Sequence, residues 1–335
     1  MPNLTIKDIA RISGCSVSTI SRVINDRPDV RPETKEHVLK VMREAGFVPN
    51  TNARQLKIQQ SRSLVFVVKG TRNLFFSDFL VKLQRAATLY GYNGIVSYLD
   101  ENANEVDAAE KILREIKPKG MIFLGGSVAN FKKGFANITV PSVLTTLVSD
   151  ELDFPNLSMV GVDDRAAAYT AVDYLIQQGH RKIAVLGGPV TSYPSVMRRE
   201  GAQQAMQDAG ILFSDKLYGL SNYDFESAYH AVNSLLARRA DFTALFAMSD
   251  VIALGAIRAL ASAGLRVPED VSVIGFDGIT MSRYCVPVLT TVVQPSEQIS
   301  LQSIELLVRQ IEHGAPAQTI TLQPELQQGE SVRAI

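Results

Sequence analysis

The chain has 335 residues, of which 46% are hydrophobic, so it can bury the cores of roughly two or three globular domains. It contains no apolar run of about 18 residues, which excludes a membrane-spanning helix, and its polar N-terminus lacks a signal-peptide core, so we expect a cytoplasmic protein. The formal net charge is zero, but residues 1–62 carry 11 Lys/Arg and 6 Asp/Glu whereas the remainder carries 23 and 28, which indicates a basic DNA-binding head on an acidic body.

Residues 5–25, TIKDIARISGCSVSTISRVIN, predict two short helices joined by a tight turn. Thr5 and Asp8 have the spacing of a capping box, in which each side chain satisfies a free backbone N–H of the other residue, and Gly14 is typical of a helix end. Ser16 can cap the second helix, whose outer surface carries small polar side chains and Arg22. A helical hairpin of any function could have these caps and this spacing, but the outer surface resembles the recognition helix of a helix-turn-helix.

The next segment predicts a third helix that completes a small three-helix core. Pro32 stands at the first helical position and Glu33 follows it, which is a common helix start. The apolar residues Val38 and Met42 lie four apart and therefore share one face of the helix.

Residues 49–57 follow as a short polar segment that cannot form a stable helix alone. One interpretation is a simple linker. The other is a segment that becomes helical only on DNA, where Leu56 would enter between base pairs in the minor groove and Ala53 would lie on the same face.

From Leu64 onward, short apolar runs alternate with amphipathic segments, which is typical of parallel sheets with helices on both faces. A first set of strands is predicted at 64–68, 94–98, 120–125 and 141–146, with helices at about 76–90 and 103–116. A second set is predicted at 182–188, 215–220, 243–248 and 271–276, with helices after Pro194, from Phe225 and over 251–263. After a helix that begins at Pro295, TITLQPEL (319–326) predicts a last strand. Two such sets indicate two similar subdomains.

The head resembles the DNA-binding domain of the lactose-repressor/galactose-repressor (LacI/GalR) family of transcription regulators. The residues that carry the resemblance are TIKDIA, SVSTISRVIN, RPETKEHVLKVMREAGFVPN and NTNARQLK, and they cover the head without a gap. The resemblance implies an all-α helix-turn-helix head and an α/β body of the periplasmic-binding-protein-like type I fold, with two doubly wound parallel-sheet subdomains. The implied domains are residues 1–48 (helix-turn-helix), 49–61 (hinge helix or linker), 62–162 plus 292–323 (N-terminal subdomain) and 163–291 plus 324–335 (C-terminal subdomain).

The resemblance also implies which residues of the head and hinge meet DNA. Val17, Ser18 and Arg22 would face base edges in the major groove, and a bidentate contact of Arg22 with guanine would give about 1–3 kcal/mol of discrimination. Leu56 would enter the minor groove, with Ala53 beside it. Contacts to phosphates, which fix the register without reading sequence, would come from Thr5, Ser16, Thr19, Ser21, Asn25, Arg31, Thr34 and Asn50.

In the body, the resemblance implies an effector-binding cleft between the subdomains, at the carboxyl ends of strands. Two aromatic residues, a flanking tyrosine and an Arg–Asp pair suited to a polyol would line it: Phe75, Phe76, Tyr223, Arg198 and Asp277. Arg198 could instead be an exposed helix residue, and one of the two phenylalanines could belong to the core. Lys69 and Arg72 depart from the family pattern; they either face solvent or add positive charge that would favour an anionic sugar.

These features predict a transcription regulator, in the main interpretation a repressor, that binds a near-palindromic double-stranded DNA operator as a homodimer and has no membrane partner. A small-molecule effector, a sugar or sugar derivative, would control operator affinity. One alternative is a regulator whose DNA binding is promoted by a corepressor or a partner protein, and another is a cytoplasmic solute-binding protein with a vestigial head. The sequence has no catalytic motif and no metal-ligand spacing, so we expect no enzyme activity, catalytic residue, cofactor or metal.

Overall fold

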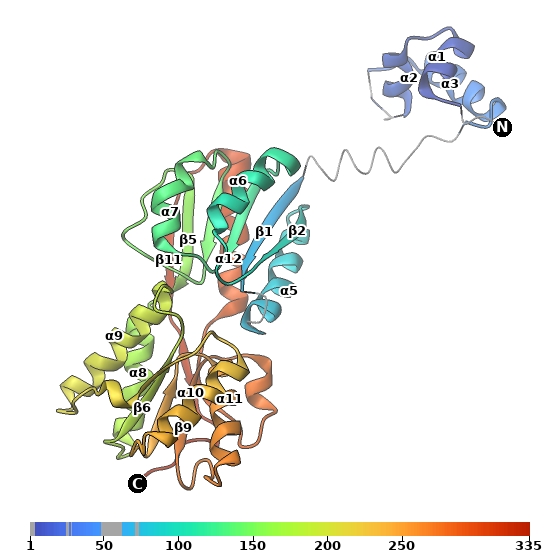
Figure 1. The fold of residues 1–335 in the computed structure, drawn as a ribbon. Helices are drawn as coiled ribbons and strands as arrows, with labels where there is room; N and C mark the ends of the chain where they lie inside the picture. The colour runs from blue at the N-terminus through green and yellow to red at the C-terminus, as the bar shows by residue number, and fades with distance from the viewer. Residues whose placement is uncertain (1–3, 25–26, 28, 48–61, 71–73) are drawn as a thin grey trace. The chain divides into compact units, whose positions relative to one another are not determined.

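The computed structural model describes residues 4–24, 27, 29–47, 62–70 and 74–335. The chain divides into two compact units, residues 1–59 and 60–335, which we call the head and the body (Figure 1). The predicted fold class, an all-α head and an α/β body with two mostly parallel sheets, is confirmed. Among the described residues, no helix is both long and apolar enough to span a bilayer.

The head contains the three predicted helices, α1 (Ile6–Ser13), α2 (Val17–Ile24) and α3 (Pro32–Glu44). The predicted capping box is present, because the Thr5 backbone N–H donates to Asp8 Oδ2 over 2.9 Å and the Asp8 N–H donates to Thr5 Oγ1 over 3.4 Å. Gly14 ends α1 in the left-handed region, with φ 65°. The small core between the helices is made of Ile9, Ala10, Ile20, Val23, Val38 and Met42.

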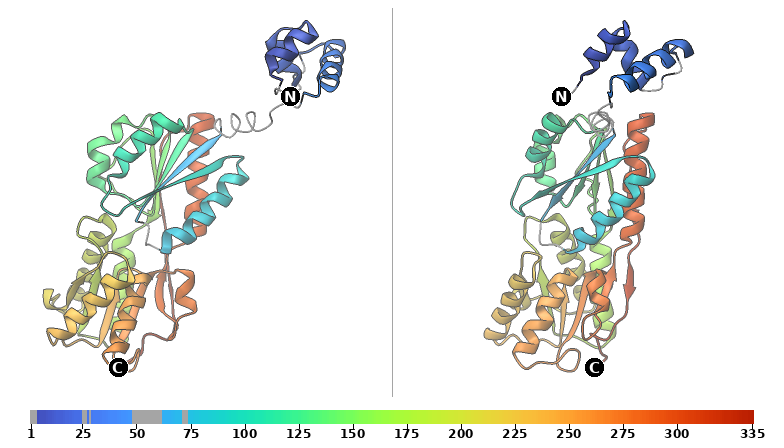
Figure 2. Two further views of the ribbon diagram at one scale, coloured as in Figure 1. Left: turned by 45° about the vertical axis from the view of Figure 1, so that its right-hand side comes forward. Right: turned by 90° about the vertical axis from the view of Figure 1, so that its right-hand side faces the viewer.

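The first lobe of the body, which we call the N-lobe, is built on a fully parallel sheet. The strand order is β11-β5-β4-β3-β1-β2, with β1 (Ser63–Lys69), β2 (Asn93–Leu99), β3 (Gly120–Leu124), β4 (Ser142–Thr145), β5 (Leu157–Val162) and β11 (Thr319–Leu322). One face packs on α5 (Leu74–Leu89) and α12 (Ser296–His313), and the other on α6 (Glu105–Ile116) and α7 (Val128–Gly134) (Figure 2). The apolar strands are thus buried on both faces.

The second lobe, the C-lobe, repeats this plan with the order β12-β10-β9-β8-β6-β7. Its strands are β6 (Ile183–Gly187), β7 (Tyr218–Leu220), β8 (Ala244–Ala247), β9 (Ser272–Asp277), β10 (Thr290–Val293) and β12 (Glu325–Gln327), of which β12 runs antiparallel to β10. The helices α8 (Asp164–Gln177) and α9 (Tyr193–Asp208) cover one face, and α10 (Phe225–Ala237) and α11 (Asp250–Ser262) cover the other. The chain crosses between the lobes at 162–164, 293–296 and 322–325.

Two details of the body differ from the sequence prediction. TITLQPEL is not one strand but two, β11 and β12, which belong to different sheets. Pro324 separates them because proline has no N–H to donate to a sheet. The strand β5 and the helix α8 were not predicted; α8 is rich in alanine, so its apolar face contrasts weakly with the rest of the helix.

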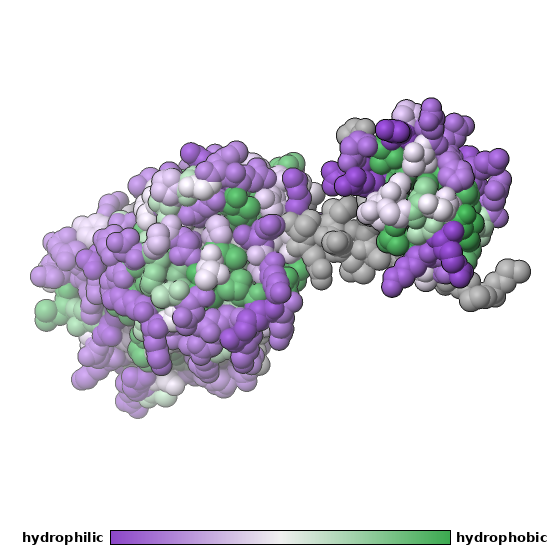
Figure 3. Space-filling view, turned by 90° about the horizontal axis from the view of Figure 1, so that it is seen from above, coloured by the Kyte–Doolittle hydropathy of each residue, from purple (hydrophilic) through white to green (hydrophobic). Residues whose placement is uncertain are grey.

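Hydrophilic side chains cover most of the body surface that Figure 3 presents, and apolar side chains appear between them in small groups. This is the expected result when each helix turns its apolar face toward a sheet.

Candidate functional site

The outer face of α2 carries the residues that the sequence predicts to read bases. Val17 is 46% exposed, and Ser18 and Arg22 are also exposed, whereas Ile20 faces the core. Arg22 Nη1 lies 3.6 Å from Asp29 Oδ2, and both side chains are more than half exposed. An exposed ion pair of this kind is worth about 0–1 kcal/mol, so Arg22 can exchange it for another partner.

Five of the predicted phosphate-binding residues lie at the starts of the three head helices: Thr5, Ser16, Thr19, Arg31 and Thr34. Thr5 caps α1, Arg31 precedes α3, and Ser16 accepts the Thr19 N–H over 3.1 Å at the start of α2. Thr34 lies in the first turn of α3, and Ser21 is half-buried in α2. Backbone N–H groups at helix starts carry partial positive charge and suit phosphate oxygens. The remaining predicted contacts lie outside the described residues: Asn25, Asn50, Ala53 and Leu56.

In the body, both lobes line a cavity of about 420 Å³. All five residues predicted to bind an effector line this cavity: Phe75, Phe76, Arg198, Tyr223 and Asp277. Phe75 is 4% exposed and also belongs to the N-lobe core, whereas Phe76 is less buried. The cavity therefore combines aromatic rings from one lobe with charged groups from the other, as a site for a polar ligand with apolar faces requires.

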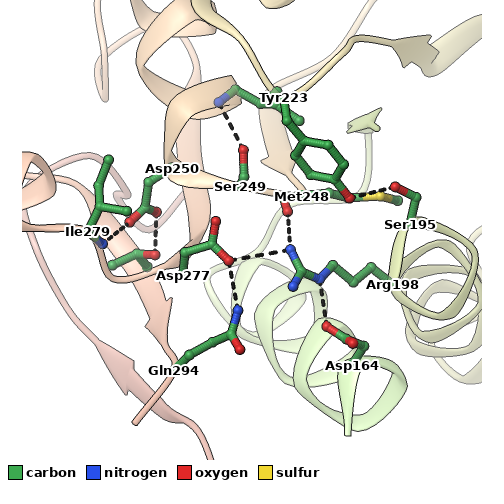
Figure 4. A network of polar contacts seen from close by, with 12 residues as sticks. Asp164, Ser195, Arg198, Tyr223, Met248, Ser249, Asp250, Asp277, Ile279 and Gln294 are labelled. Carbon is green, nitrogen blue, oxygen red and sulfur yellow. Dashed lines mark hydrogen bonds and ion pairs between the residues drawn. The ribbon is translucent and has the colours of Figure 1, made fainter. Parts of the chain in front are cut away.

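Arg198 is the central charged group of this cavity, and the alternative that it is an exposed helix residue is wrong (Figure 4). Its side chain is 5% exposed, and Nε donates to Asp164 Oδ1 over 2.7 Å. Nη1 donates to the Met248 carbonyl oxygen and lies 3.5 Å from Asp277 Oδ1. The guanidinium carbon lies 3.7 Å from the ring centroid of Phe276. A buried guanidinium needs such partners, because desolvating an unpaired charge is strongly unfavourable.

The pKa values in this network follow from burial and mutual attraction. Burial alone would lower the pKa of Arg198, but Asp164 and Asp277 hold it above its usual value. Burial raises the pKa of Asp164, and Arg198 opposes this rise. Burial also raises the pKa of Asp277 to about 6, against the attraction of Arg198. Asp277 consequently changes its charge in the slightly acidic range, well above the ordinary range of an aspartate.

Gln294 supports Asp277 and has one buried acceptor without a partner among the described residues. Its Nε2 donates to Asp277 Oδ1 over 2.8 Å, while its Oε1 is buried and has no hydrogen-bond partner among the described residues. An unpaired buried acceptor is costly, by about 1–3 kcal/mol, unless a ligand supplies a donor. Gln294 lines the cavity, but its Oε1 is buried, so in this geometry the residue acts on the cavity through its bond to Asp277.

Tyr223 closes another wall of the cavity. Its hydroxyl lies 2.5 Å from Ser195 Oγ, and its backbone is in the left-handed region with φ 57°. A Cβ on Gly188 would lie 2.2 Å from the Tyr223 ring, so a glycine is required beside it. The unusual backbone conformation and the close approach together fix the ring against the cavity.

The turn after β9 connects the cavity to the N-lobe. Asp277 has φ 109°, and the next residues are held by the fully buried Asp250, whose Oδ2 accepts the Ile279 N–H over 2.8 Å. The Thr280 Oγ1 then donates to Asp78 Oδ2 of α5 over 2.8 Å. Residues 277–280 thus join a cavity wall to a contact between the lobes.

Sequence reasoning missed four residues of this arrangement: Asp78, Asp164, Asp250 and Gln294. The adjacent carboxylates Asp163 and Asp164 have different partners: Asp163 accepts the Ala166 N–H, and Asp164 binds Arg198. The signal for Asp164 was its place directly after a strand, at the start of a helix. Of the two alternatives for Lys69, the one in which its side chain faces solvent is wrong, because Lys69 lines the cavity and its Nζ donates to the fully buried Glu105 over 2.8 Å. Arg72 lies outside the described residues.

Known proteins of similar sequence match this chain over nearly its whole length. A family model described as "Bacterial regulatory proteins, lacI family" matches residues 5–50, and one described as "Periplasmic binding protein-like domain" matches residues 172–332. The HTH-type transcriptional regulator MalR of Clostridium butyricum is 37% identical over 331 residues, which cover 98% of this chain and 99% of MalR.

Two further proteins are similar over nearly their full length. The HTH-type transcriptional repressor PurR of Histophilus somni (strain 129Pt) is 30% identical over 334 residues, 99% of each chain. The solved structure of a complex between the transcriptional regulator CelR and cellobiose is similar, with a TM-score of 0.74 and 27% identity, over 98% of this chain and 99% of that one.

The raised pKa of Asp277 predicts a pH-dependent stability. The folded state favours the protonated form of Asp277. Its contribution to the free energy of unfolding is therefore fully present below about pH 4 and is lost as the pH rises through about 6. Relative to Asp277→Asn, the wild type should lose up to about 3 kcal/mol of unfolding free energy between pH 4 and pH 7. Urea unfolding of both proteins at several pH values measures this difference. A difference that stays constant with pH contradicts the assigned pKa.

Proposed function

The chain belongs to the LacI family of bacterial regulatory proteins, and from this premise we propose that it is a transcriptional repressor of the cytoplasm whose operator affinity is controlled by a sugar-like effector bound between the two lobes. One observation carries the effector part of the proposal: five residues chosen from the sequence come from both lobes and meet in one cavity. A ligand that touches both lobes can favour one arrangement of the lobes over another, which is what control of a distant site requires.

The charges and rings of the cavity favour a polyhydroxy ligand. Arg198 donates and Asp277 accepts, so the pair can bind neighbouring hydroxyl groups by charge-assisted hydrogen bonds. Gln294 holds the Asp277 carboxylate in place, and the ring of Phe76 suits the apolar face of a sugar. CelR was solved with cellobiose, and we propose a ligand of the same broad class here.

The head would bind DNA through α2 in the major groove. Arg22 would be the strong base-reading side chain, and Val17 and Ser18 would make smaller contacts. The residues at the three helix starts would hold phosphates, with Asn25 and Asn50 in the same role. Ala53 and Leu56 would act in the minor groove.

We propose that the chain acts as a homodimer through one side of the body. In Figure 1, α5, β2 and α11 follow that side. Large apolar side chains are exposed on α5, on β2, on α10 and on the segment after β9: Val81, Tyr98, Phe225, Met281, Tyr284 and Val286. Such a surface suits a second copy of the chain. A dimer would present two α2 helices to half-sites about 34–36 Å apart.

The turn at residues 277–280 is the route that we propose from ligand to lobe arrangement. A ligand that binds Asp277 also acts on Thr280, because only Gly278 and Ile279 separate them and Asp250 clamps that pair. The Thr280–Asp78 bond would then form in one arrangement of the lobes and break in another. Coupling of this kind is typically about 1–3 kcal/mol.

Selection from random duplex DNA tests DNA reading directly. The full-length protein should enrich a near-palindromic site whose half-sites lie about one helical turn apart. In Arg22→Ala, discrimination at one base position of each half-site should fall by about 1–3 kcal/mol. Arg11→Ala, an exposed change on α1, is the matched control and should select the wild-type sequence. If Arg22→Ala also selects the wild-type sequence, Arg22 does not read bases.

Thr280→Val tests the proposed route, because it keeps the size of the side chain and removes the hydroxyl donor to Asp78, while the longer backbone N–H contact of 3.3 Å can remain. The ratio of operator affinities with and without effector should change by about 2- to 10-fold, the range expected for one hydrogen bond. Fluorescence anisotropy with labelled operator gives this ratio. Thr170→Val is the control, since the exposed Thr170 hydroxyl donates to the Ala166 carbonyl oxygen within α8. An unchanged ratio in Thr280→Val would exclude this contact from the route.

A further inference from the structure

A cluster of three charged side chains on the N-lobe wall has no role in the function described so far. Lys69 lies at the end of β1, and its Nζ donates to Glu105 Oε2 over 2.8 Å. Glu105 is fully buried and also accepts the Ser127 N–H over 2.6 Å and the Asn130 Nδ2 over 3.1 Å. Its carboxylate is therefore fully occupied within the N-lobe.

Glu101 is the member of the cluster that remains open to the cavity. It lines the cavity together with Lys69, and its carboxylate has no hydrogen-bond donor among the described residues. Its Oε2 lies against Gly70, where a Cβ would come within 2.4 Å of it. Burial raises the pKa of Glu101, and the attraction of Lys69 opposes this rise. A second negative charge beside this carboxylate would be poorly solvated by the same burial, and so would be unfavourable too.

The cations of the cavity are already matched by carboxylates. Lys69 binds Glu105, and Arg198 binds Asp164. Neither of these two carboxylates is among the residues that line the cavity. On the lining itself, Asp277 shares Arg198 with Asp164, and Glu101 is a further carboxylate in excess of the two cations. Within the part of the chain that the structure describes, no cation of the lining is left unpaired to receive a phosphate or a carboxylate. This is opposite to the expectation that Lys69 would favour an anionic sugar.

We propose that Glu101 is a specificity-determining residue, which makes the cavity select uncharged ligands with hydroxyl donors and reject phosphorylated or acidic forms of the same ligands. The inference rests on the proposed function, because it takes the cavity to be the effector site. Glu101 would accept a ligand hydroxyl on the N-lobe side while the Asp277 carboxylate accepts one on the C-lobe side. Rejection of anions would come from repulsion by Glu101 and Asp277 at short range in a partly desolvated site.

Matched pairs of ligands test this proposal with the full-length protein. Glucose, maltose, cellobiose, ribose and adenosine would each be compared with a phosphorylated form, by thermal shift and then by calorimetric titration of the pair that binds. We expect the uncharged member to bind and its phosphorylated form to bind at least about 100-fold more weakly. A phosphorylated form that binds equally or better, or no binding by any uncharged member, overturns the proposal.

The variant Glu101→Gln isolates the charge, since it keeps the shape of the side chain. It should reduce the preference for the uncharged member by about 10-fold, mainly by improving the binding of the phosphorylated form. Glu115→Gln, an exposed change on α6, is the control and should leave the preference as in the wild type. Equal preference in wild type and Glu101→Gln, with equal thermal midpoints, would assign the selectivity to other residues and overturn the role of Glu101.

Failure of this inference can be separated from failure of the proposed function. If a phosphorylated ligand binds and alters operator affinity, the cavity is the effector site but its selectivity has been misassigned. If an uncharged ligand binds with the expected preference and operator affinity does not change, Glu101 has the inferred role and the proposed regulation is wrong.

Discussion

The burial of one positive charge, that of Arg198, is the constraint on which the site depends. A guanidinium at 5% exposure must be surrounded by acceptors, and the chain supplies them from three elements: Asp164 at the start of α8, the Met248 carbonyl after β8, and Asp277 at the end of β9. Each acceptor lies at the carboxyl end of a strand or directly after one. The C-lobe sheet supplies two of these groups, at the ends of β8 and β9, and the first crossing of the chain from the N-lobe strand β5 supplies Asp164, so all three meet the arginine of α9.

The same network explains why the backbone near the cavity adopts unusual conformations. The backbone of Asp277 has φ 109°. The hydrogen bond from Gln294 to its side chain and the hydrogen bond from the Ile279 N–H to Asp250 stabilise this conformation. Gly275 permits this arrangement, because a Cβ there would lie 2.3 Å from Asp250 Oδ1. Strain of this kind is maintained only where surrounding contacts enforce it. Since the strained turn ends at the bond between the lobes, the cavity and the lobe arrangement share one short segment of chain.

Much of this could be predicted from the sequence, and the failures have physical causes. Caps and apolar spacing placed the head helices, because these signals are local. Arg198 and Tyr223 came from motifs that resemble those of a known family. By contrast, no local sequence motif indicates which residues Asp164 and Asp250 would contact. Their partners, Arg198 and Ile279, are 34 and 29 residues away along the chain. The environment of the Lys69 ammonium group could not be predicted, because its buried partner, Glu105, lies on a helix far along the chain. Long-range pairing of buried charges is what sequence patterns do not encode.

The central claim is that the occupied cavity and the DNA-reading head affect each other's affinity. The direct measurement is the operator dissociation constant of the full-length protein with and without saturating effector, together with the effector dissociation constant with and without saturating operator. Linkage requires both ratios to be the same, and we predict a common value of about 5- to 150-fold. An operator affinity that saturating effector leaves unchanged, while the effector occupies the cavity, would contradict the account.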